Sequence, residues 1–220
     1  VIAAQLAEEE GDKWLTADPK ERLAHFMDYG KKKELEKIDR DLKAYRVTMQ
    51  SWMHETFFYE NNSKRINDCL QHMADMGLTY EKDGALWFKS TDYGDDKDRV
   101  LIKSDGQAAY FAGDVAYYLN KRERGADAAI YLLGADHHGY IGRMMAMCAA
   151  FGDEPGKNMQ ILIGQLVNVM KDGKPVRMSK RTGKAIQLGD LLDEVPVDSA
   201  RFLFNMREAN SLLDLSLIHI

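Results

Sequence analysis

Residues 129–140 read Ala-Ile-Tyr-Leu-Leu-Gly-Ala-Asp-His-His-Gly-Tyr, and this stretch decides the fold class that the sequence predicts. The apolar run Ala129 to Leu133 predicts a buried strand, and a helix is predicted from Gly139 to Phe151. A second strand is predicted from Gln160 to Met170. Strand, helix and strand in this order indicate an α/β fold in which crossover helices connect a parallel sheet. Open sheets of this kind bind ligands at the carboxyl ends of their strands, so the residues after Gly134 are a predicted binding segment.

Two antiparallel hairpins are predicted before this region. Asp83-Gly84 and Asp105-Gly106 each lie between apolar, strand-like runs, and Asp-Gly is a strong signal for a hairpin turn. The second hairpin would pair Val100–Ile102 with Ala108–Phe111. The other predicted helices are Val1–Glu10, one marked by the helical spacing of Leu35, Ile38, Leu42 and Tyr45, one capped by Ser63 and ended by Gly77, Asp114–Arg124, and two short helices from about Asp190 and about Asp198.

Composition bounds the class of protein. The chain has 220 residues, 45% of them hydrophobic, which is enough to bury a core. Thirty basic against 35 acidic side chains give a net charge of -5, so any contact with nucleic acid must come from local basic patches. Cys69 and Cys148 show no zinc-ligand spacing, and no apolar run approaches the roughly 20 residues that cross a bilayer. We expect a cytoplasmic protein, and, because the chain begins at Val1 within a predicted helix, a piece of a longer one.

A basic loop follows the second predicted strand. Arg177-Met178-Ser179-Lys180-Arg181 precedes Thr182-Gly183-Lys184. Cations on a Gly-containing loop can close on a triphosphate and stabilise the charge that develops as pyrophosphate leaves. A solvated basic loop without this function is the competing interpretation.

The segment after Gly134 has three interpretations. Gly134 lets the backbone approach a nucleotide, and Asp136 can accept hydrogen bonds from ribose hydroxyls. Asp136 could instead cap the following helix. A zinc site on Asp136, His137 and His138 is disfavoured, because three consecutive residues rarely converge on one ion.

Tyr110 and Asp114 form a third candidate group. A carboxylate with a phenol hydroxyl nearby suits a guanidinium group, whose planar fork needs acceptors placed for paired hydrogen bonds. Capping of a helix by Asp114 is the structural alternative.

Together these motifs resemble a known family. Met-Ser-Lys at 178–180 is similar to the phosphate-loop signature of class I aminoacyl-tRNA synthetases, with Arg177 and Arg181 as departures from it. The chain from about residue 20 to residue 214 resembles bacterial arginyl-tRNA synthetase. The resemblance rests on Gly134–Ile141 (Gly-Ala-Asp-His-His-Gly-Tyr-Ile), Asp83–Trp87 (Asp-Gly-Ala-Leu-Trp), Gly94–Leu101 (Gly-Asp-Asp-Lys-Asp-Arg-Val-Leu) and Gln165–Val167 (Gln-Leu-Val).

The resemblance implies roles for individual residues. Tyr110, Asp114 and His137 would contact the arginine side chain, while Gly134 and Asp136 would face the ATP ribose. The other implied ATP-binding residues are Gln165, Leu166 and Val167 beside the adenine and Met178, Ser179 and Lys180 at the phosphates, with Lys180 as the catalytic residue.

The implied activity is that of an arginine–tRNA ligase, which activates arginine with ATP and transfers it to tRNA. Mg²⁺ would accompany ATP, and no zinc or other protein-bound metal is expected. The first-half ATP-binding element with paired histidines has no match here, so the chain alone is expected to be inactive. The family is typically monomeric, and this chain is expected to self-associate through an uncovered half-sheet. A non-catalytic RNA-binding module and another adenylyl-transferring enzyme remain the alternatives.

The expected fold is thus a partial Rossmann-like catalytic domain with a helical and hairpin insertion. Its predicted parts are the insertion at 1–104, the second half of the nucleotide-binding domain with the phosphate loop at 105–194, the start of a helical stem-contact region at 195–214, and a non-family tail at 215–220.

Overall fold

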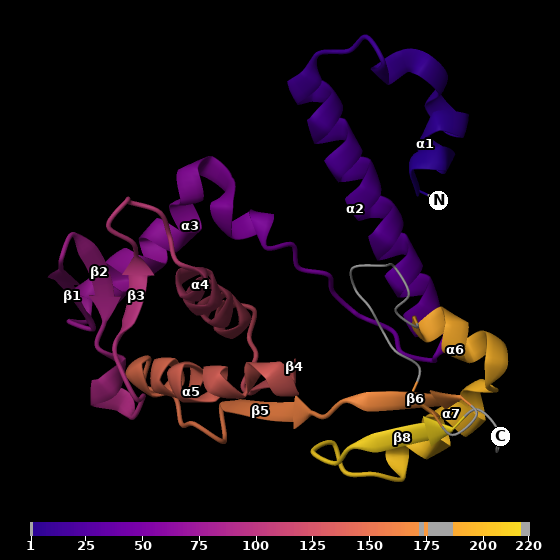
Figure 1. Ribbon diagram of the computed structural model, residues 1–220. Coiled ribbons are helices and arrows are strands. Elements are labelled where there is room, and N and C mark those ends of the chain that lie inside the picture. Colours follow the sequence, from indigo (N-terminus) through magenta and orange to yellow (C-terminus); the bar gives the residue numbers. More distant parts are fainter. Residues whose placement is uncertain (1, 172–173, 176–186, 217–220) are drawn as a thin grey trace. The chain divides into compact units, whose positions relative to one another are not determined.

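The computed structural model describes residues 2–171, 174–175 and 187–216 of a mixed α/β chain (Figure 1). Two compact units are distinguished. One comprises residues 53–167 and 207–213, and the other comprises the described residues of 1–52, 168–206 and 214–220. The predicted part boundaries at residues 104, 194 and 214 stay predictions.

The unit built on residues 53–167 contains the predicted binding segments and the main core. Its helices α3, α4 and α5 pack with a three-stranded antiparallel sheet and a two-stranded parallel one (Figure 1). Ile66, Met73, Leu101, Val115 and Met147 are completely buried in this core. Its elements are α3 (Thr56–Asp75), β1 (Thr79–Lys82), β2 (Ala85–Phe88), the 3₁₀ helix η2 (Ser90–Tyr93), β3 (Arg99–Ile102), α4 (Tyr110–Glu123), β4 (Ala129–Gly134), the 3₁₀ helix η3 (Ala135–Tyr140), α5 (Ile141–Ala150) and β5 (Met159–Gly164).

The first predicted hairpin is confirmed and the second is wrong. β1 and β2 pair antiparallel around Asp83 and Gly84, which both adopt the positive φ that a two-residue hairpin turn requires. β3 pairs with β2 instead of with residues 108–111, where only Ala108 forms an isolated bridge to Ile102. The last two residues of this run, Tyr110 and Phe111, begin α4 instead, because helical spacing buries Phe111 with Ala112 and Val115.

The Gly94–Leu101 motif has a structural role. The Arg99 side chain is 10% exposed and makes two 2.7 Å hydrogen bonds to the Asp95 carboxylate, which is 2% exposed. Burial opposes ionisation of Asp95, yet the hydrogen bonds from Arg99 lower its pKa to about 2. A Cβ at Gly142 of α5 would lie 3.0 Å from an Asp95 oxygen, so this ion pair packs directly against α5.

α3 is interrupted near its start. Asn61, Asn62 and Ser63 have φ of 51°, 56° and 57°, a left-handed conformation that is costly for residues other than glycine. The predicted capping of a helix by Ser63 is therefore wrong, because a cap residue has extended backbone angles. The break lets the turn at Thr56–Tyr59 point away from the axis of the rest of α3, whereas Gly77 ends the helix as predicted with φ of 74°.

The predicted parallel pair of strands is confirmed. β4 and β5 pair in parallel with α5 between them in sequence, and Gly134 pairs with Gly164 at their carboxyl ends. The single strand predicted from Gln160 to Met170 is wrong, since it breaks at Gln165 and Leu166.

One face of the β4–β5 pair carries exposed apolar side chains. Ala129 and Met159 face the core, and the alternate residues Ile130, Leu132 and Leu162 are 60%, 77% and 45% exposed. Parallel sheets are normally covered on both faces. An apolar face of this kind favours association with another surface.

We expect the 220-residue chain to self-associate through this face. Leu132→Glu places a charge at its centre and should shift the chain toward monomer, as measured by sedimentation velocity. Met76→Glu, at an apolar side chain 43% exposed elsewhere in the same unit, is the matched control. A wild-type chain that stays monomeric at high concentration would contradict the expectation.

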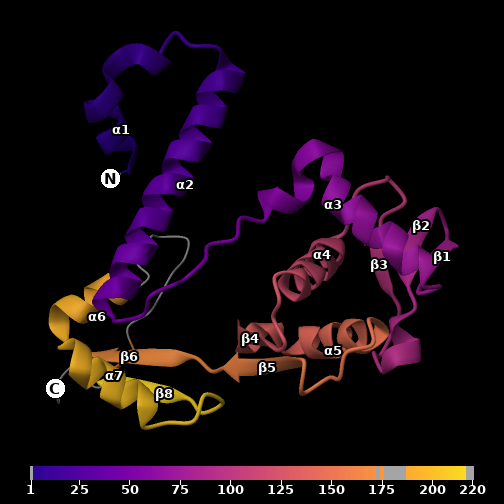
Figure 2. The ribbon, with the colours of Figure 1, turned by 180° about the vertical axis from the view of Figure 1, so that it is seen from behind.

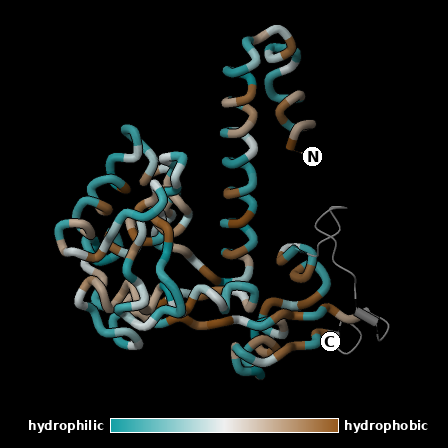
Figure 3. The backbone as a smooth tube through the Cα atoms, turned by 60° about the vertical axis from the view of Figure 1, so that its left-hand side comes forward, coloured by the Kyte–Doolittle hydropathy of each residue, from teal (hydrophilic) through white to brown (hydrophobic). Residues whose placement is uncertain are grey.

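The second unit is built around one long helix, seen from behind in Figure 2. α2 (Pro19–Ala44) begins at the Asp18 cap, whose carboxylate accepts hydrogen bonds from the backbone of Lys20 and Glu21. Hydrophobic and hydrophilic residues alternate along this helix (Figure 3). The other elements are α1 (Ile2–Glu10), the 3₁₀ helix η1 (Gly11–Trp14), β6 (Val167–Lys171), β7 (Lys174–Pro175), α6 (Leu188–Glu194), α7 (Val197–Asn205) and β8 (Leu213–Ser216).

The two short helices predicted near Asp190 and Asp198 are confirmed as α6 and α7. α6 is fixed by a capping box between Gln187 and Asp190. Leu215, at the start of the predicted tail, is buried in β8. No helix in the described part of the chain has the length and apolar character needed to span a membrane.

Candidate functional site

A cavity of about 260 Å³ contains Asp114. Asp114 lies in the second turn of α4, whose N-cap is Ala109, so the structural alternative of a helix cap is wrong. Glu55, immediately before α3, lines the same cavity, together with Met53, Phe58, Gly113 and Tyr117. Two carboxylates thus share one partly apolar cavity, an arrangement that suits a cationic ligand.

Gly113 explains how the start of α3 comes so close to α4. A Cβ built on Gly113 would lie 3.2 Å from the Tyr59 hydroxyl and 3.7 Å from a Glu55 carboxylate oxygen. Any side chain at this position would crowd the phenol. Neither Glu55 nor Tyr59 was identified from the sequence, because both lie before the break in α3 and carry no motif.

The cavity has an unusual charge balance. Burial and the neighbouring Glu55 carboxylate raise the pKa of Asp114 to about 6, and Arg143 and Lys121 partly oppose this shift. The group is therefore mostly ionised at neutral pH and protonates in mildly acidic solution. A bound cation would relieve the repulsion between the two carboxylates.

Tyr110 lies one turn before Asp114 at the start of α4. Its side chain is 82% exposed and does not line the cavity. The structure thus places the two residues on one helix without bringing the phenol of Tyr110 to the carboxylate of Asp114.

The segment from Gly134 to Tyr140 leaves the carboxyl end of β4. Asp136 lies inside η3 and makes no capping hydrogen bond, so the capping alternative is wrong here too. A Cβ on Gly134 would lie 2.9 Å from an Asp136 carboxylate oxygen, so any other residue at this position would require the exposed Asp136 side chain to shift. His137 Nε2 lies 3.7 Å from Asp136, and its ring packs edge-on against Tyr140. His137 is half-exposed and lies outside the cavity that contains Asp114.

Gln165 and Leu166 connect β5 to β6. The Gln165 backbone amide donates to Ala209 at 2.8 Å, and the Leu166 side chain is 69% exposed. Because Gly134 and Gly164 pair, the segments that follow them leave the sheet at the same edge. This edge is where open α/β sheets bind ligands.

The predicted phosphate loop, with Met178, Ser179 and Lys180, lies outside the described residues. Val167, the last of the three predicted adenine contacts, is the first residue of β6. In the described part of the chain, no group of three or more His, Cys, Asp or Glu side chains is placed to hold a metal ion.

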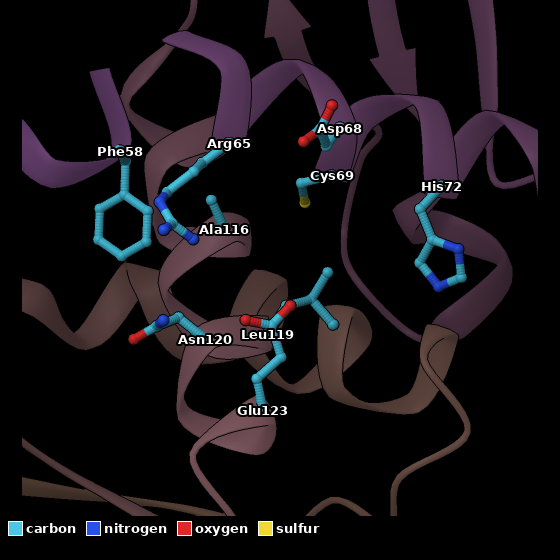
Figure 4. A pocket seen from close by; sticks show the side chains of 9 residues that line it. All are labelled: Phe58, Arg65, Asp68, Cys69, His72, Ala116, Leu119, Asn120 and Glu123. Atoms are coloured by element: carbon cyan, nitrogen blue, oxygen red, sulfur yellow. The ribbon is translucent and has the colours of Figure 1, made fainter. Parts of the chain in front are cut away.

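A second cavity, of about 240 Å³, lies between α3 and α4 (Figure 4). Its charged lining residues have both signs: Arg65 and Asp68 come from α3 and Glu123 comes from α4. Asn120, 8% exposed, lines it as well. None of the site residues predicted from the sequence lines this cavity.

Comparisons with known proteins identify the family of this chain. Residues 10–215 match the family model described as tRNA synthetases class I (R), catalytic domain. An arginine–tRNA ligase of Bifidobacterium animalis subsp. lactis is 57% identical over 83% of this chain and 31% of its own length. That of Shouchella clausii is 52% identical over 97% of this chain and 38% of its own length. The chain thus spans about a third of the length of these relatives.

A solved structure from Campylobacter jejuni, described as that of an arginyl-tRNA synthetase, has 31% sequence identity and a TM-score of 0.87. The match covers 98% of this chain and 46% of that one. The family match, 10–215, includes the whole main core of the unit built on residues 53–167. The chain therefore belongs to the family of class I tRNA synthetase (R) catalytic domains.

Proposed function

We propose that this chain is part of an arginine–tRNA ligase and that its Asp114 cavity receives the guanidinium group of arginine. The observation that carries the proposal is the pairing of Asp114 and Glu55 around one cavity on the scaffold of this family. Two carboxylate groups present acceptors for the several N–H donors of a guanidinium. A neutral side chain would leave both carboxylates unpaired and would bind poorly.

The finer architecture is part of the proposal. The unit of β4, α5 and β5 would be half of a Rossmann-like nucleotide-binding sheet, and ATP would bind at its carboxyl edge. Gly134 and Asp136 would face the ribose, Gln165 to Val167 would lie beside the adenine, and Lys180 would act on the phosphates. The common edge that the Gly134–Gly164 pairing creates supports this assignment.

The proposed chemistry needs no nucleophile from the protein. A carboxylate oxygen of arginine attacks the α-phosphorus of ATP, the bond to the β-phosphate oxygen breaks, and pyrophosphate leaves with that electron pair. A terminal tRNA hydroxyl then attacks the arginyl carbonyl, loses its proton, and displaces AMP. The residues of this chain would contribute by positioning the reactants and stabilising charge. Mg²⁺ belongs to the proposal as the companion of the ATP phosphates.

Calorimetry at controlled pH tests the arginine assignment. L-arginine should bind the chain, whereas L-citrulline, which is neutral, and L-lysine, which lacks the planar fork, should bind far more weakly. Arginine affinity should fall as the pH drops from 7 through about 6, where Asp114 protonates.

Glu81→Gln removes an exposed carboxylate on β1 and should leave this pH profile unchanged. Equal affinity for arginine and citrulline would refute the assignment. Binding of tRNA without any response to arginine or ATP would identify an RNA-binding module instead.

A further inference from the structure

The side chain of Lys121 lies between two aromatic rings. Its Nζ is 3.8 Å from the centre of the Tyr117 ring and 3.7 Å from the centre of the Tyr131 ring. Tyr117 comes from α4, like Lys121, and Tyr131 comes from β4. An ammonium this close to two aromatic faces is attracted to both by cation–π interactions.

Tyr117 connects this cluster to the Asp114 cavity. Tyr117 lines the cavity, whereas Lys121 and Tyr131 do not. The Tyr131 hydroxyl is buried without a hydrogen-bond partner in the described part of the chain, so no hydrogen bond from that hydroxyl fixes the ring. The ammonium of Lys121 is the group that joins the two rings.

We propose that Lys121 is a positioning residue whose ammonium holds the Tyr117 ring against Tyr131, so that the ring remains a wall of the cation-binding cavity. The inference rests on the proposed function, in which the cavity lined by Tyr117 binds arginine. Lys121 acts on that ligand only through Tyr117.

The charge of Lys121 is sensitive to pH near neutrality. Burial and, to a smaller extent, the positive charge of the nearby Arg124 lower the pKa of Lys121 to about 8, and the Asp114 carboxylate partly opposes this shift. The charged and titratable groups around this cluster are Asp114, Tyr117 and Arg124 on α4, Tyr131 on β4, Arg143 and Cys148 on α5, and Glu55 before α3. Burial raises the pKa of Tyr131, which keeps that phenol neutral in the same range. The ammonium should therefore hold Tyr117 in most molecules at pH 7, and this hold should be lost as the pH rises through about 8.

Tyrosine ring signals test the hold without any ligand. In the chain labelled with ¹³C-tyrosine, the Tyr117 and Tyr131 signals should shift between pH 6 and 9 with a midpoint near 8. Lys121→Met should abolish the shift. Lys121→Arg should also abolish the shift, because arginine stays charged over this pH range. Its tyrosine signals should remain where those of the wild type lie at pH 7. The internal control is Tyr80 of the antiparallel sheet, whose hydroxyl donates a hydrogen bond to the Asp98 carboxylate.

Arginine affinity tests the consequence. At pH 7, Lys121→Met should weaken L-arginine binding about tenfold, the scale of one partly buried cation–π interaction, and Lys121→Arg should restore it. Equal affinities of Lys121→Met and wild type, or wild-type Tyr117 signals that do not change with pH, would overturn the inference. The wild-type titration requires no variant, so a misfolded variant cannot obscure the result. If the tyrosine signals shift with pH but arginine does not bind, the contact between Lys121 and Tyr117 is supported and the proposed function is refuted.

Discussion

In the full-length arginine–tRNA ligase that we propose, Asp114→Asn is expected to lower kcat/KM for arginine by on the order of 10² or more. The substitution keeps the size of the side chain and removes its charge. The guanidinium would then face one carboxylate, Glu55, and an amide that presents N–H donors toward other donors. The measurement is arginine-dependent pyrophosphate exchange by the variant and the wild type.

The same substitution should leave the folded state as stable as wild type or more so. The pKa of Asp114 is raised on folding, to about 6, so its protonated form is favoured in the folded protein. Its contribution to stability is therefore fully present at low pH and is lost as the pH rises through about 6. Asparagine is neutral at every pH and avoids this loss.

Thermal unfolding of both proteins at pH 5 and pH 7.5 separates the two roles. Asp114→Asn should unfold at a higher temperature than wild type at pH 7.5, and the difference should shrink at pH 5. A destabilised variant with normal arginine kinetics would show that Asp114 serves only the fold. The chain would then remain a member of its family with an unassigned amino-acid pocket.

Lys180→Ala should have an effect of similar size on a different step. If the ammonium meets charge that develops only as pyrophosphate leaves, the rate of arginine activation should fall by roughly 10²–10³ with little change in arginine affinity. Single-turnover kinetics and calorimetry measure the two quantities separately.

Lys184→Ala, in the same basic stretch, is the matched control and should retain most of the activity. Unchanged activation by Lys180→Ala would favour the interpretation of this stretch as a solvated basic loop.

The parts of the fold with local signatures could be predicted from sequence. The Asp83-Gly84 hairpin follows from a turn that needs two positive φ angles, and β4 with β5 follows from short apolar runs. The start of α4 was misplaced, because Ala108–Phe111 has the apolar character of a strand. Only packing against the core shows that Tyr110 and Phe111, the last two residues of this run, begin the helix.

The candidate site was only partly predictable for a related reason. Asp114 was found through its neighbours in sequence and a family resemblance. Glu55 was not, because its approach to Asp114 depends on the packing of α3 on α4 across Gly113. The left-handed break at Asn61–Ser63, which turns Glu55 and Tyr59 away from the axis of the rest of α3, has no glycine to reveal it. The pairing of charges thus arises from tertiary structure that no local pattern encodes.

The alignment of Gly134 with Gly164 determines which mutations this sheet tolerates. Inserting or deleting one residue within β4 or β5 would displace everything beyond it by about 3.3 Å and turn each following side chain to the opposite face. Asp136 and Gln165 would then no longer leave the sheet together, although neither had been replaced. We therefore expect the lengths of both strands to be constrained more strictly than the identities of their exposed residues. Libraries of single-codon deletions across 129–164 should show loss of function in the strands and tolerance at 152–157, in the turn before β5.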